Sequence, residues 1–115
     1  MTNGINGKWA GACHNTTCNV TAELTLILHQ EGAALGGMLL LGGDELSGSG
    51  AIHGTVEGAY VVFTSPGTPG LFNDIVWCGT LNGNCIQGTY RVEPDAAGTA
   101  AGAFVQIGTF TVWKE

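Results

Sequence analysis

The chain has 115 residues, of which only 10% are charged, and nine acidic side chains against three basic ones give a net charge of −6. This length predicts one domain over residues 1–115 that is large enough to bury a core. The few basic side chains cannot form the electropositive surface that nucleic acids and anionic membranes attract, and no apolar run is long enough for a membrane-spanning helix.

Two further features of the composition constrain the fold. Glycine accounts for 20 residues without a triplet repeat, and the hydrophobic share of 44% argues against disorder. The charged share lies far below the roughly 25% of typical globular domains, so neutral or apolar surface must face water. We interpret this surface as an indication of a homo-oligomer.

Alternating apolar residues, interrupted by glycine, are typical of β-strands. Every stretch with helical spacing of apolar residues is broken by glycine, so little helix is expected. Eight strands are predicted, at residues 5–13, 21–30, 33–41, 49–56, 59–65, 72–81, 84–92 and 102–113.

The connections between these strands alternate between short and long. Two-residue turns with glycine second are predicted at Glu31-Gly32, Glu57-Gly58 and Asn82-Gly83. Longer connections are predicted at residues 14–20, 42–48, 66–71 and 93–101. In a meander, alternate connections lie at opposite ends, so one end has the tight turns and the other has the long loops. We therefore expect an all-β fold, an eight-stranded antiparallel up-and-down β-barrel without free edges.

The turn positions also predict which residues face the interior. The interior sets are Leu24, Leu26, Leu28, Leu35, Gly37, Leu39 and Leu41; Ile52, Gly54, Val56, Ala59, Val61 and Phe63; and Ile75, Trp77, Gly79, Ile86, Gly88 and Tyr90. The opposite face is mostly polar, but it also carries apolar residues that we interpret as a subunit contact: Ile27, Met38, Leu40, Tyr60, Val62 and Val76. The last strand is apolar on both faces around Gly108, where a bulge would switch the faces.

Gly7-Lys8-Trp9 lies near the start of the first predicted strand, ahead of the eight-strand meander. This pattern resembles the calycin-type barrels, which include lipocalins, avidins and small bacterial protease inhibitors with an avidin-like barrel. The resemblance implies that Trp9 plugs the closed end and packs under the core. An avidin pocket has polar groups surrounded by tryptophans, whereas Trp77 and Tyr90 are the only polar-tipped members of the interior sets predicted here, so no biotin-binding residue is transferred.

The chain has four cysteines, and an even number in a small glycine-rich β protein favours an oxidising compartment, periplasmic or secreted. Cys13 and Cys18 flank a four-residue loop and are predicted to form a disulfide. Free thiols, or a zinc site with His14, are the alternatives, although a fourth zinc ligand is missing. Cys78 and Cys85 are expected to be diagonal neighbours on one face and to remain unbridged.

Acidic residues gather at or near the expected long-loop end: Glu23, Asp44, Glu45, Asp74, Glu93 and Asp95. We favour the interpretation that they solubilise the loops, with an acidic mouth for a cation or basic partner as the alternative. His14, His29 and His53 do not cluster, and no nucleophile-base-acid set can be assembled. The sequence therefore predicts no catalytic residue, no metal site and no cofactor.

Four aromatic residues are candidates for a ligand site below the long loops: Trp77, Tyr90, Phe63 and Phe104. They line a cavity there, or they simply fill the core. The sequence favours a non-enzymatic barrel that binds a small, mostly apolar ligand at the long-loop end. Two alternatives remain, a protein-interaction or inhibitor-like oligomeric barrel and a barrel-mouth enzyme of cyclase or isomerase type.

Overall fold

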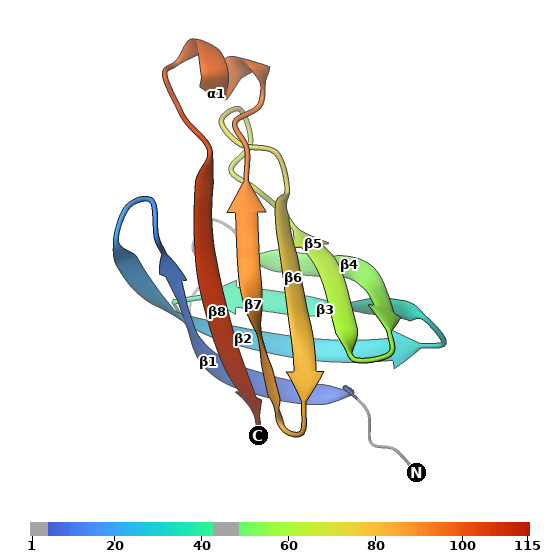
Figure 1. The fold of residues 1–115 in the computed structure, drawn as a ribbon. Helices are drawn as coiled ribbons and strands as arrows, with labels where there is room; N and C mark the ends of the chain where they lie inside the picture. The colour runs from blue at the N-terminus through green and yellow to red at the C-terminus, as the bar shows by residue number, and fades with distance from the viewer. Residues whose placement is uncertain (1–4, 43–48) are drawn as a thin grey trace.

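The computed structural model describes residues 5–42 and 49–115, and within them eight antiparallel strands form one closed sheet. Each strand pairs with its neighbours in sequence, and the last strand returns to the first (Figure 1). The elements are β1 (Gly7–Asn15), β2 (Val20–Glu31), β3 (Ala34–Leu41), β4 (Gly50–Glu57), β5 (Tyr60–Ser65), β6 (Ile75–Asn82), β7 (Cys85–Val92), α1 (Ala96–Ala100) and β8 (Gln106–Lys114). The predicted eight-stranded antiparallel β-barrel is confirmed.

The three predicted tight turns lie one residue later than expected. Glycine occupies the first central position of each turn, with positive φ angles of 61°, 62° and 64° at Gly32, Gly58 and Gly83. The flanking pairs are Glu31 with Ala34, Glu57 with Tyr60, and Asn82 with Cys85. Glycine at the first position is favoured by type II′ turns, whose twist suits antiparallel strands. The pairing therefore shifts by two residues, which leaves the inner and outer faces unchanged.

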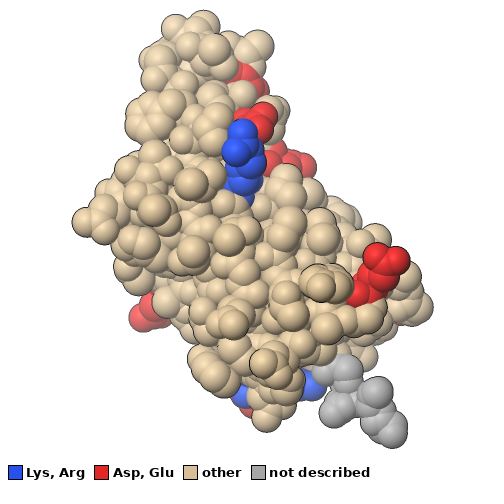
Figure 2. Space-filling view, viewed as in Figure 1, with Lys and Arg blue, Asp and Glu red and all other residues tan. Residues whose placement is uncertain are grey.

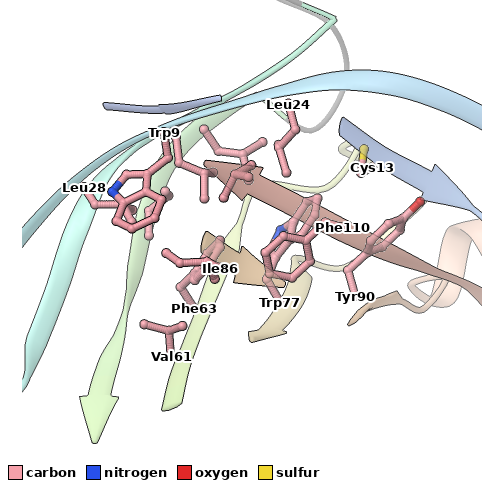
Figure 3. Packing of buried hydrophobic residues seen from close by; sticks show 14 of the residues in the cluster. Trp9, Cys13, Leu24, Leu28, Val61, Phe63, Trp77, Ile86, Tyr90 and Phe110 are labelled. Atoms are coloured by element: carbon pink, nitrogen blue, oxygen red, sulfur yellow. The ribbon is translucent and has the colours of Figure 1, made fainter. Parts of the chain in front are cut away.

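The three interior sets are confirmed in their main members. Leu26 lies opposite Leu39, Val56 opposite Val61, and Trp77 opposite Tyr90, with most of these side chains buried in one core (Figure 3). Ala59 is the exception, because it occupies a turn position and is exposed. The outer apolar residues are exposed as predicted, except that Leu40 is half-buried.

The segment before the last strand differs most from the prediction. Residues 96–100 form the short helix α1, so β8 begins at Gln106 and not at residue 102. Asp95 caps this helix, because its Oδ1 accepts a hydrogen bond from Gly98 N at 2.7 Å. No bulge interrupts the described strand β8, which pairs in continuous register with both neighbours and buries Phe110 and Val112.

The two ends of the barrel differ as the sequence predicted. The tight turns lie at one end, where Trp9 is fully buried and its Nε1 donates to Ile5 O at 3.0 Å. This is the position that the calycin resemblance implies for the tryptophan. The described long connections lie at the other end, where α1 and the β5–β6 loop come together (Figure 1). Predicted strand residues 72–74 belong to that loop, and Phe72 forms a bridge with Pro94.

Candidate ligand-binding site

A cavity of about 270 Å³ opens among the long connections. It lies where β1, β3 and β7 end and where β6 and β8 begin, and the β5–β6 loop covers one side. Its apolar lining residues are Leu41, Phe72, Ile75, Trp77 and Val92. The other lining residues are Cys13, Asn15, Gly67, Thr68, Tyr90 and Gln106.

The structure brings two of the four predicted site residues to this cavity. The rings of Trp77 and Tyr90 lie 4.7 Å apart between centroids and are tilted by 39°. Phe63 is buried one layer deeper and stacks against Trp77 at 6.0 Å, so it supports the cavity without lining it. Phe104 is 59% exposed outside the cavity, because its segment is a connection and not the predicted strand.

Trp77 forms a fixed part of the cavity wall. Its Nε1 donates a hydrogen bond to Ser65 Oγ at 2.9 Å, and both residues are almost completely buried. The ring of Phe110 meets the indole edge-on at a centroid distance of 5.4 Å. The hydrogen bond satisfies the indole N–H, so Trp77 contributes apolar ring atoms to the cavity wall. Ser65 has no sequence signal for this role, since it lies at the end of a short strand.

A cluster of hydrogen-bonded residues, Asn15, Cys18 and Gln106, borders the cavity where β1 and β8 meet. Asn15 Nδ2 donates to Gln106 Oε1 at 2.7 Å, and the Cys18 thiol lies 3.7 Å from the same oxygen. Asn15 Oδ1 in turn accepts from the backbone N–H of Cys18 at 2.9 Å. Sequence reasoning missed both amides, because Asn15 and Gln106 are 91 residues apart and meet only when the barrel closes.

The Tyr90 hydroxyl is the prominent polar group of the cavity. No described residue forms a hydrogen bond with it, although the side chain is only 9% exposed. Burial, with smaller contributions from the nearby thiols of Cys13 and Cys18, raises the pKa of Tyr90 to about 12. The phenol is therefore protonated at neutral pH and can donate a hydrogen bond. Gly108 makes room for this ring, since a Cβ there would lie 2.4 Å from it.

Charged side chains lie away from the described lining of the cavity. Arg91 and Glu93 pair with each other at 2.8 Å on the outside, and Asp95 caps α1. Asp44 and Glu45 lie outside the described residues, so the predicted acidic gathering is only partly visible. The described acids thus have surface and capping roles, which agrees with the solubilising interpretation.

The cysteines are separate thiols in the structure. Cys13 is buried beside the cavity, and burial raises the pKa of its thiol, whereas Cys18 is exposed. The Cys13–Cys18 disulfide is therefore not formed here and stays a prediction. Cys78 pairs with Thr89 and Cys85 with Asn82, so the shifted register separates the two thiols that were expected to be diagonal neighbours.

The histidines do not assemble a reactive site in the structure. His14 Nδ1 lies 2.8 Å from Thr21 Oγ1, and His29 Nε2 lies 3.6 Å from a Glu31 carboxylate oxygen. Within residues 5–42 and 49–115, no three His, Cys, Asp or Glu side chains are placed to hold a metal ion. The same residues include no helix with the length and apolar character needed to cross a membrane.

Comparison with known proteins supports the fold and leaves the family open. No family model and no curated protein sequence matches this chain. Among solved structures, the chain is similar to EF1p2_mFAP2b in its complex with DFHBI, with a TM-score of 0.71 and 15% sequence identity. The match covers 96% of this chain and 93% of that chain. At this identity, the similarity shows a shared barrel fold over nearly the whole length.

Proposed function

We propose that this protein is a non-enzymatic barrel that binds a small, mostly apolar ligand in the cavity at its long-loop end. The main support is the cavity itself, where aliphatic and aromatic side chains surround a space with a few polar groups. Ligand pockets in proteins generally combine apolar walls with a small number of placed polar groups. The similar barrel EF1p2_mFAP2b is bound to DFHBI, which supports ligand binding as a use of this architecture.

The chemistry of the lining favours binding over catalysis. The described lining includes neither a histidine nor a carboxylate that could act as a general base near neutral pH. Its one thiol, Cys13, has a raised pKa and is therefore a poor nucleophile, because the thiolate is the reactive form. The protonated Tyr90 hydroxyl suits hydrogen bonding to a ligand.

Naphthalene is a suitable first probe because it is apolar, flat and small. At a free concentration tenfold above its Kd, binding should stabilise the protein by about 1.4 kcal/mol and raise Tm by roughly 4–8 °C. The Leu41→Trp variant, which fills the cavity, should lose this increase. The neighbouring Leu40→Trp variant should keep it, because Leu40 lies on the outer face. Thermal unfolding and native mass spectrometry measure the effect, and the absence of both a Tm shift and a complex would contradict the proposal.

Self-association through the outer face is a second candidate function. Ile27 and Met38 lie opposite each other on β2 and β3 and are 45% and 42% exposed. Tyr60, Val62 and Val76 are also exposed outside the barrel, and little charge covers the face of β6–β8 (Figure 2).

The oligomeric state tests this candidate directly. Light scattering should give a mass above that of one chain, and Met38→Lys should return the protein to a monomer. Ala100→Lys is the matched control, since it adds the same charge at an exposed position of α1, away from the exposed apolar residues of β2, β3, β5 and β6. A monomeric wild-type protein at high concentration would remove this candidate.

A further inference from the structure

We infer that the ligand is an uncharged molecule with a flat apolar body and a hydrogen-bond acceptor, held by the Trp77 ring and the Tyr90 hydroxyl. This inference rests on the proposed function and names the class of ligand that the same cavity takes. Three properties of the cavity carry it, namely the charge of the lining, the hydrogen-bonding groups left uncommitted, and the shape of the aromatic wall.

The described lining offers no opposite charge to a charged ligand. None of the described residues around the cavity is a lysine, arginine, histidine, aspartate or glutamate. An ion that left water for this site would lose hydration without gaining an opposite charge. Arg91 and Glu93, the charges beside β7, already form a pair with each other on the surface. The described lining therefore disfavours carboxylates and ammonium groups.

The uncommitted polar groups at the cavity can all donate a hydrogen bond, and besides Tyr90 and the Gln106 amide they include the Thr68 hydroxyl, which can also accept one. The indole N–H of Trp77 is used by Ser65. Asn15 gives a hydrogen bond to Gln106 Oε1, so the oxygen of Gln106 is engaged while its amide NH₂ remains available. Tyr90 has a protonated hydroxyl without a hydrogen-bond partner among the described residues. A ligand that complements these groups must supply an acceptor, such as a carbonyl oxygen.

The aromatic wall favours a flat body. The rings of Trp77 and Tyr90 lie side by side in the lining, and the Tyr90 hydroxyl is directed away from the packed core (Figure 3). The volume of about 270 Å³ lies just below the usual range for ligand pockets, so the body is small. A compound with two fused rings and one short substituent combines this size with contact to both residues.

Three matched probes separate these properties: 2-ethylnaphthalene, 2-acetylnaphthalene and 2-naphthoate. They share one ring system and differ in having no acceptor, a neutral acceptor or a charge. In titrations monitored by calorimetry, the ketone should bind roughly 2- to 12-fold more tightly than the hydrocarbon, as one neutral hydrogen bond allows. The carboxylate should bind at least about tenfold more weakly than the ketone, because its charge is desolvated without a partner.

Tyr90→Phe tests the hydroxyl while retaining the ring. The variant should lower the affinity for the ketone to that of the hydrocarbon and leave the hydrocarbon unaffected. Tyr60→Phe is the matched control, because Tyr60 is 66% exposed on the outer face and should change neither affinity. Thermal unfolding of both variants verifies that the barrel is intact.

The binding results separate a failure of the inference about the ligand class from a failure of the proposed function. Equal binding of ketone and hydrocarbon, an unchanged ketone affinity in Tyr90→Phe, or tight binding of the carboxylate would overturn the inference and leave the ligand-binding function standing. If naphthalene and all three derivatives fail to bind, the proposed function itself is wrong.

Discussion

Replacing Trp77 by alanine should lower the free energy of unfolding by about 3–5 kcal/mol, the usual cost of removing a large buried aromatic side chain. Trp77 is 1% exposed and contacts the rings of Phe63, Tyr90 and Phe110. The same variant should lose naphthalene binding, because the indole is part of the cavity wall. Denaturant unfolding and calorimetry measure the two effects.

A double-mutant cycle can divide this loss between packing and hydrogen bonding. Trp77→Phe leaves the buried Ser65 hydroxyl without its partner, an additional cost of about 1–3 kcal/mol. In a Ser65→Ala background this additional cost should disappear, because both ends of the hydrogen bond are then absent. Strictly additive effects of the two substitutions would show that the hydrogen bond contributes nothing. Tyr60→Ala, at an exposed position, should change stability by no more than about 0.5 kcal/mol.

Gly37→Ala should destabilise the barrel by more than about 3 kcal/mol or prevent folding, which puts it among the most damaging single substitutions. Gly37 has a φ of +133°, and a Cβ at this position would lie 1.8 Å from Ile27 O on the paired strand. The neighbouring backbone cannot move away without breaking the β2–β3 pairing, in which Gly37 lies opposite Leu28. Circular dichroism during denaturant unfolding measures the loss.

Gly36→Ala is the matched control on the same strand. Its added Cβ would meet only Ile52 O, at 3.8 Å, and its φ lies outside the positive range. This substitution should change stability by no more than about 1 kcal/mol. The change is stabilising if the lower conformational entropy of the unfolded chain outweighs the effect of the added methyl group in the folded one. Similar stabilities of the two variants would contradict the close approach of β2 and β3 at Gly37.

Local patterns in the sequence were sufficient to predict the strands and to predict which of their side chains face the interior. Side-chain direction alternates along every strand, so a run such as Leu24, Leu26 and Leu28 identifies an inner face before any partner strand is known. The predicted register was displaced by two residues, because a glycine can occupy either central position of a two-residue turn. The faces survived this displacement, since a shift of two residues preserves the alternation.

The helix and the site were harder to predict because they depend on distant contacts. Residues 96–100 are small and lack helical periodicity, and Gly98 fits closely against Leu71 of another loop, where a Cβ would lie 1.8 Å from the carbonyl oxygen. This packing places residues 101–105 in a connection and moves Phe104 away from the cavity.

By itself, the sequence determined a closed barrel with one end of tight turns, a buried apolar interior and an aromatic pair, Trp77 and Tyr90, toward the end with the long loops. Barrel closure decided the rest of the site, because it joins Asn15 to Gln106 and brings the β5–β6 loop over the opening. The folded structure also decided that Tyr90 lines the cavity, whereas Phe63 packs behind Trp77. The physical reason is the range of the forces: strand alternation and turn conformation act between neighbours in sequence, whereas a cavity is bounded by residues that meet only in the folded chain.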